Sequence, residues 1–231
     1  MTLFIIIIIA TMALSGWASW RVRSAYNRYS QVPTLSGLNG AQTAAAILRE
    51  EGIHDVEIAE QPGHLTDHYD PMNKRLVLSS ENYHGQSAAA IGVAAHECGH
   101  AIQHKVAYAP LNMRMAAVGI TNFASQIVMW GPLIFMATGL VRPYTGLTIM
   151  AIAFGVLMVF QLITLPVEFD ATRRAKLALS NMGIIRRGPE SIAVEKMLGA
   201  AGFTYVAAFI TTLASFLYYA LPLLTGRSSD D

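Results

Sequence analysis

Long apolar segments alternate with polar ones along the whole chain. Four of them are long enough to form membrane helices, and they cover residues 3–20, 118–141, 145–166 and 203–224. A helix needs about 20 apolar residues to cross the hydrocarbon core of a bilayer, which is roughly 30 Å thick. The second segment carries Asn122, Gln126 and Pro132, which a membrane helix tolerates where they face other helices. The pattern therefore predicts a mainly α membrane protein with about four transmembrane helices.

The first apolar segment has two interpretations, a membrane anchor or a cleaved signal peptide. Signal peptides begin with a basic region before their apolar core. Here no basic residue precedes the core, and Arg21 and Arg23 follow it directly. We therefore favour an anchor whose N-terminus lies outside the cell.

The polar segment 21–117 has the mixed pattern of a small α+β domain. A helix is expected over Ala41–Glu51, because the glycine that follows is favoured just after a helix end. Short strands are expected at 56–59 and 75–78, on either side of a turn-rich stretch, so a small β-hairpin or a sheet edge is predicted. A second, alanine-rich helix is expected over 87–106.

The distribution of charge orients these segments. Only 13% of the residues are charged, whereas soluble domains carry about 25%, so much of the chain must lie in a membrane. Lys and Arg are enriched in cytoplasmic loops, and eight of the 16 lie in 21–117 and six in 167–202. We therefore expect both segments on the cytoplasmic side of a bacterial plasma membrane, where the run Arg173, Arg174 and Lys176 would contact anionic lipid. No basic patch interleaved with aromatic residues occurs away from the membrane ends, which argues against a nucleic-acid partner.

The heptapeptide AAHECGH, residues 94–100, lies in the predicted alanine-rich helix. Histidines four residues apart project from one helix face, so His96 and His100 could hold one zinc ion. Glu97 would lie beside the ion and act as a general base, taking a proton from metal-bound water and passing it to the departing amine. Because so short a pattern also occurs by chance, a solvated helix with two incidental histidines is the alternative.

A catalytic zinc site needs a third protein ligand. The acidic candidates that follow the motif on the same side of the membrane are Glu168, Asp170, Glu190 and Glu195. Two of them, Glu168 and Asp170, lie where the third apolar segment ends. Two membrane crossings separate them from His100, so the chain returns them to the side of the motif. A solvated contact with lipid head groups is the alternative interpretation for either residue.

Three segments together resemble a known family. GHLTDHYDP, GVAAHECGHAIQH and LPVEFDATRRA resemble the YugP-like family of membrane-bound neutral zinc metallopeptidases, over nearly the whole chain. The layout is more distantly similar to HtpX-type membrane zinc proteases, whose third zinc ligand is a glutamate after a helical hairpin. The resemblance implies a zinc metalloendopeptidase of gluzincin type with a zincin-like cytoplasmic domain, in which Glu168 joins His96 and His100 as a ligand. The HtpX class usually has an aspartate where this chain has Thr172, and Asp170 could support a ligand or replace one.

Residues near the motif have ordinary interpretations beside functional ones. His104 lies one turn beyond His100 and could contact substrate, although a hydrogen-bonded surface histidine is favoured. His68 lies in a turn-rich stretch that could form the rim of a cleft, with the following RLVLSS strand pairing to an extended peptide. Cys98 points roughly away from the ligand face, as a small core residue would.

The sequence thus favours a membrane-anchored zinc endopeptidase acting on membrane-associated proteins or peptides at the cytoplasmic face. One alternative is an intramembrane protease, but only about eight small apolar residues precede His96, too few for a spanning helix. The other is a zinc-binding scaffold or adaptor without catalysis. A structural zinc site closes all four positions with protein ligands and has no use for Glu97.

Overall fold

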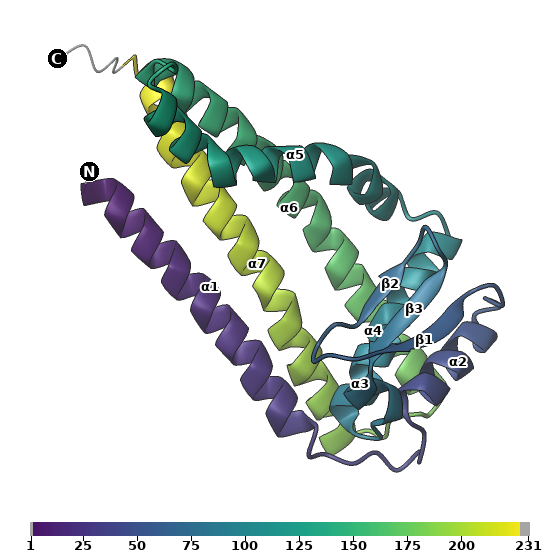
Figure 1. Ribbon diagram of the computed structural model, residues 1–231. Helices are drawn as coiled ribbons and strands as arrows, with labels where there is room; N and C mark the ends of the chain where they lie inside the picture. Colours follow the sequence, from purple (N-terminus) through teal and green to yellow (C-terminus); the bar gives the residue numbers. More distant parts are fainter. Residues whose placement is uncertain (1, 227–231) are drawn as a thin grey trace. The chain divides into compact units, whose positions relative to one another are not determined.

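The computed structural model describes residues 2–226, apart from the side chains of residues 3 and 4 (Figure 1). Within this range the chain forms seven helices and one three-stranded sheet. In chain order the elements are α1 (Thr2–Tyr29), α2 (Gly40–Glu50), β1 (Glu57–Gln61), β2 (His68–Asp70), β3 (Arg75–Ser79), α3 (Ser80–His84), α4 (Ala88–Lys105), α5 (Ala109–Thr138), α6 (Pro143–Asn181) and α7 (Pro189–Leu224). The prediction of a mainly helical protein with a small sheet is confirmed.

Four helices, α1, α5, α6 and α7, are long and apolar enough to cross a membrane. Helices α1, α6 and α7 each contain a whole predicted apolar segment and extend beyond it at one end or both, whereas α5 begins before residue 118 but ends at Thr138, three residues short of the predicted 141. With 39 residues, α6 would measure about 58 Å at 1.5 Å per residue, nearly twice the thickness of the hydrocarbon core. A hydropathy boundary marks only where the side chains become polar, and the helical backbone can continue past it, as α6 does to Asn181. The chain leaves α6 only near Gly183, which adopts a left-handed φ of +65°.

The chain forms two compact units. Of the described residues, 2–17, 113–165 and 205–226 belong to the first unit, and 18–112 and 166–204 belong to the second. The first contains the most apolar parts of the long helices. Inside it, Phe154 of α6 and Tyr219 of α7 stack with their ring centroids 5.4 Å apart, and Gly155 lies against the ring of Phe216. The second unit contains the sheet and every candidate site residue.

The sheet of the second unit has the strand order β1–β3–β2. The two predicted strands at 56–59 and 75–78 correspond to β1 and β3, and they pair in parallel, so they do not form the expected hairpin. The hairpin lies instead between β2 and β3, which are antiparallel. Strand β2 has only three residues, HYD, and no apolar alternation that would reveal it in the sequence.

The central position of β3 also changes the expectation for substrate pairing. Both edges of β3 are hydrogen-bonded, one to β1 and one to β2. Its middle residues Leu76, Val77 and Leu78 are buried. The strand RLVLSS therefore has no free edge for an extended peptide, and that expectation was wrong for this strand.

Polar contacts tie the end of α1 to the sheet. The hydroxyl of Tyr26 donates to Asn82 Oδ1 at 2.7 Å, and Asn82 Nδ2 donates to Asp67 at 2.8 Å. Asp67 also accepts from the backbone N–H of Ser79 at 2.8 Å. Asp67 therefore links two elements, which is more than the turn-forming role that its local sequence indicates.

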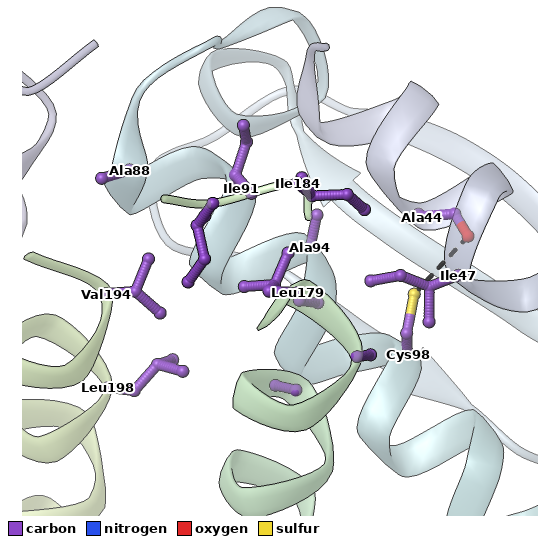
Figure 2. Close-up of a cluster of buried hydrophobic side chains, with 14 of the residues drawn as sticks. Ala44, Ile47, Ala88, Ile91, Ala94, Cys98, Leu179, Ile184, Val194 and Leu198 are labelled. Atoms are coloured by element: carbon purple, nitrogen blue, oxygen red, sulfur yellow. Dashed lines mark hydrogen bonds between the residues drawn. The ribbon is translucent and has the colours of Figure 1, made fainter. Parts of the chain in front are cut away.

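Helix α4 forms the centre of the hydrophobic core of the second unit (Figure 2). It begins at Ser87, whose side chain caps the helix by accepting from the N–H of Ala90. Its small buried residues allow α2, α6 and α7 to pack closely, and Ala94, Ile91, Leu179 and Ile47 are all fully buried. The opposite face of this helix carries the histidines, so the core holds the motif in a fixed place.

Candidate zinc site

His96 and His100 project from one face of α4, as expected for residues four apart in a helix. Their ring centroids lie 4.9 Å apart and the rings are nearly perpendicular. The His96 side chain is 15% exposed and the His100 side chain is 11% exposed. Both rings are thus shielded from water but can be reached, as a catalytic site requires.

Glu168 reaches the two histidines from α6, and it is almost completely buried. Its Oε2 lies 3.3 Å from His96 Nε2 and 3.5 Å from His100 Nε2. These three side chains form a group of potential metal donors whose atoms all lie within 4.8 Å of one another. The structure therefore brings together the three residues that the sequence indicated as ligands.

The distances in this group fit a zinc ion. Zinc bound to nitrogen and oxygen at about 2.0–2.1 Å in a tetrahedron has ligand atoms separated by roughly 3.3–3.4 Å. The two separations to Glu168 Oε2 are 3.3 and 3.5 Å. Two imidazoles and one carboxylate are also a donor set that zinc prefers. Two of the three donor separations therefore match a tetrahedral zinc site, and all three lie within 4.8 Å.

A glycine in the motif explains how α6 comes so near. A Cβ atom built on Gly99 would lie 2.5 Å from the carbonyl oxygen of Ala171, on the adjoining turn of α6 from Glu168. Any larger residue at this position would therefore push α6 away. Gly99 is therefore a point of close backbone contact between α4 and α6.

The second nitrogen of each histidine also has a partner. His96 Nδ1 lies 3.2 Å from the hydroxyl of Thr172, and His100 Nδ1 lies 3.0 Å from Gln103 Oε1. Partners of this kind fix the rotation of a ligand imidazole. Thr172 thus contacts His96 from the position at which the HtpX-type pattern has an aspartate.

Burial and the neighbouring negative charges shift the pKa of His100 in opposite directions. Burial alone would lower its pKa, but the hydrogen bond to Glu168 and the negative charges of Glu97 and Glu168 outweigh it, so the pKa of His100 is raised. Glu97 is 8% exposed. Glu97 follows His96 on α4, and its negative charge contributes to the raised pKa of His100.

Asp170 does not belong to the group of donors. Its Oδ2 accepts from Gln103 Nε2 at 3.0 Å and from Arg174 Nε at 2.6 Å, and Arg173 binds its other oxygen. Asp170 therefore contacts Gln103, the hydrogen-bond partner of His100, and is not one of the grouped donors. Its position two residues after Glu168 turns it to another side of α6.

The other two acidic candidates lie in different surroundings. Glu190, at the start of α7, is buried and accepts from the backbone N–H groups of Leu35 and Arg186. It joins the connector after α1 to the turn before α7. Glu195 is exposed on α7. Neither is part of the donor group.

None of the other five histidines joins the donor group within the described part of the chain. His104 Nδ1 is hydrogen-bonded to the hydroxyl of Tyr69 at 2.9 Å, and burial raises the pKa of that tyrosine to about 12. His68 is exposed and bonds the carbonyl oxygen of Thr66. His104 is therefore a hydrogen-bonded histidine, as its more ordinary interpretation expected.

Cys98 lies in the hydrophobic core, with its side chain toward Ala44 of α2 (Figure 2). Its Sγ donates to the carbonyl oxygen of Ala44 at 3.7 Å, and burial raises the pKa of its thiol. It is therefore a small core residue, as the sequence indicated.

Sequence reasoning missed one residue of the site, Gln103. It lies on α4 one turn after His100, with no exposed surface, and it contacts both His100 and α6. The available signal was weak, because a glutamine three residues after a histidine on a helix is common. Its role in the site becomes visible only when α6 packs against it.

Comparisons with known proteins agree with the geometry. A family model described as "Putative neutral zinc metallopeptidase" matches residues 4–223. The chain is 42% identical over 228 residues to the "Putative membrane protease YugP" of Bacillus subtilis (strain 168), and the match covers 99% of this chain and 100% of that protein. No solved structure matches the chain. Together with its four apolar helices, this similarity indicates a membrane protein. The chain belongs to the family described as "Putative neutral zinc metallopeptidase".

Proposed function

We propose that this protein is a membrane-anchored zinc endopeptidase in which His96, His100 and Glu168 hold the ion and Glu97 is the general base. The observation that carries the proposal is the spacing of the donor atoms, 3.3 and 3.5 Å from Glu168 Oε2 to the two histidines. The family match supports the same chemistry.

The roles of the side chains follow from their positions. A bound zinc ion would supply a Lewis acid that polarises a peptide carbonyl and lowers the pKa of water. His96 and His100 would hold the ion through Nε2, because their Nδ1 atoms have other hydrogen-bond partners. Glu97 takes a proton from the attacking water and delivers it to the departing amine. A positioned general base of this kind contributes about 10²–10⁴-fold to the rate.

The number of donors favours catalysis over a structural zinc site. The one donor group found among residues 2–226 has three members. Structural zinc sites are closed by four protein ligands, whereas catalytic sites keep one position open for water or substrate. Three donors beside a buried glutamate support the endopeptidase over the scaffold.

The character of α4 supports a site outside the bilayer. Helix α4 has 18 residues and is not among the four candidate membrane helices. It follows the short polar helix α3, SENYH. An intramembrane protease would need this motif within a spanning helix, so the structure favours a site beside the membrane.

The position of Glu168 indicates which substrates are within reach. It lies three residues after Leu165, where the apolar run of α6 ends. We place the site on the cytoplasmic side, because the segments that carry it contain most of the Lys and Arg residues. A site so near the end of an apolar run suits membrane-associated proteins and peptides as substrates.

Replacement of the base tests the reaction. In Glu97→Gln, purified in detergent, we expect bound zinc to remain and cleavage of a peptide library to fall by about 10²–10⁴-fold. Glu50→Gln changes an exposed glutamate on α2 and serves as the matched control, with activity unchanged. If Glu97→Gln binds zinc and cleaves as fast as the unsubstituted protein, the proposed mechanism is wrong.

The membrane side is tested separately by labelling introduced cysteines. Arg142→Cys lies in the turn between α5 and α6, and Lys176→Cys lies eight residues after Glu168 on α6. A membrane-impermeant maleimide added to intact cells should label the first and not the second. The opposite pattern would place the site outside the cell.

A further inference from the structure

Gln103 connects a ligand histidine to the helix that carries the third ligand. Its side chain is fully buried. Its Oε1 lies 3.0 Å from His100 Nδ1. Its Nε2 donates to the carbonyl oxygen of Val167 at 2.7 Å and to Asp170 Oδ2 at 3.0 Å. One amide thus uses both of its ends, one toward the ligand and one toward α6.

The two acceptors on α6 decide which way the amide points. A backbone carbonyl and a carboxylate can only accept, so they require the NH₂ group of Gln103 on their side. The reversed amide would set its oxygen against both oxygens and leave buried groups unpaired, which is costly. The Gln103 oxygen is therefore the atom that faces His100.

This orientation in turn decides where His100 carries its proton. A carbonyl oxygen can only accept, so the ring must present an N–H at Nδ1. The lone pair of the neutral ring then lies on Nε2, the nitrogen that is 3.5 Å from Glu168. A ligand histidine needs this tautomer to bind a metal through Nε2.

Asp170 is itself held firmly. Arg174 donates to its Oδ2 at 2.6 Å and Arg173 binds its other oxygen, and both arginines lie on the same helix. With two guanidinium groups as partners, the carboxylate stays in place as an acceptor for Gln103. Helix α6 therefore supplies both the third ligand and the anchor for the partner of the second.

His96 differs from His100 in this respect. Its Nδ1 faces the hydroxyl of Thr172, and a hydroxyl can either donate or accept. Thr172 therefore orients the ring without selecting a tautomer, whereas the Gln103 amide selects one.

We propose that Gln103 is a positioning residue that holds His100 with its proton on Nδ1, so that Nε2 is ready to bind the zinc ion. The inference rests on the proposed function, because it assumes a metal held by His96, His100 and Glu168. It gives Gln103 and Asp170 a supporting role. Helix α6 then both supplies the third ligand, Glu168, and anchors the residue that orients the second, His100.

Two substitutions separate this role from a simple contact between helices. Gln103→Met has similar length but offers no acceptor to His100, and Gln103→Glu keeps an acceptor. Both lose the amide donor to Val167 O. The measurement is the zinc dissociation constant of the purified full chain, obtained by competition with a chromophoric chelator. We expect Gln103→Met to bind zinc about 10–100-fold more weakly and Gln103→Glu to stay within about threefold of the unsubstituted protein.

A control and the thermal midpoint complete the test. Gln86→Met removes another glutamine side-chain hydrogen bond to the backbone, that of Gln86 to Gly37, and should leave zinc binding unchanged. Thermal unfolding without zinc should show both variants destabilised, and Gln103→Glu the more so, because its carboxylate would face the oxygens of Val167 and Asp170; a higher zinc affinity of Gln103→Glu therefore cannot come from greater stability. A difference in zinc affinity between them then comes from the acceptor.

Two results would overturn the inference. If Gln103→Met binds zinc as tightly as the unsubstituted protein, His100 needs no partner at this position. If both variants lose affinity equally, Gln103 acts only as a contact between helices. Failure of the unsubstituted protein to bind zinc would instead refute the proposed function, and this inference with it.

Discussion

A single methyl group added at Gly99 should disturb the zinc site without touching any ligand. The Cβ atom of Gly99→Ala would lie 2.5 Å from the carbonyl oxygen of Ala171, while real Cβ atoms essentially never come closer than 3.0 Å. The obstacle is backbone, which cannot rotate away, so α4 and α6 must separate locally by at least 0.5 Å, the difference between these two distances.

The displacement should reach the ligands because of where Ala171 lies. It follows Glu168 by one turn on the same helix, so the carboxylate moves with it. Metal sites tolerate deviations of about 0.2 Å in ligand distances, and the required shift is larger. We expect the zinc affinity of Gly99→Ala to fall about 10–100-fold, the range seen when the support of a ligand is lost. Overpacking should cost about 1–3 kcal/mol, partly offset by the roughly 1 kcal/mol gain in helix propensity.

The assay is chelator competition for zinc, together with thermal unfolding of the zinc-free protein. Gly199→Ala is a matched control, because Gly199 lies within α7 and an added Cβ meets nothing within 4 Å. That variant should bind zinc normally and be equally or more stable. If Gly99→Ala binds zinc as tightly as Gly199→Ala does, the close contact of α4 with α6 does not set the position of Glu168.

Three further predictions concern the core and the metal. Leu179→Ala removes a fully buried side chain, so the free energy of unfolding measured by chemical denaturation should fall by about 2–5 kcal/mol. Leu177 is 48% exposed, so Leu177→Ala should change the free energy of unfolding by less than about 0.5 kcal/mol. Equal effects of the two substitutions would refute the assigned core. Cys98 should resist iodoacetamide in the folded protein even above neutral pH, because burial raises its pKa, and should react rapidly once unfolded; fast labelling of the folded protein would show that the core is open. Zinc at about a thousand times its dissociation constant should stabilise the folded protein by about 4 kcal/mol, which would appear as a higher thermal midpoint. A similar rise of the midpoint in His96→Ala at the same zinc concentration would mean that the ion binds elsewhere.

The local features of this fold could be predicted from the sequence, because they depend on neighbouring residues. The HExxH spacing places His96 and His100 on one face of any helix, and apolar runs of about 20 residues mark membrane helices wherever they occur. Glu97 followed from its place beside the first histidine. Glu168 depended on counting membrane crossings and on the resemblance to the family.

Features that depend on packing between distant segments were not predictable. Strand β1 pairs with β3 in parallel only because the chain crosses over between them, and no local pattern in 56–59 or 75–78 records that choice. Gln103 looks like any polar residue until α6 places Val167 O and Asp170 against it. The ends of the long helices differ from the hydropathy boundaries because backbone hydrogen bonds continue where side chains turn polar.

The most direct test of the central claim is the number of zinc ions bound per chain in Glu168→Gln, measured after dialysis against a weak chelator. If α6 supplies the third ligand, the unsubstituted protein and Glu195→Gln, which changes an exposed glutamate of α7, should each retain one zinc ion per chain. Glu168→Gln should retain almost none. Full zinc occupancy in Glu168→Gln would show that another residue completes the site and would contradict the account.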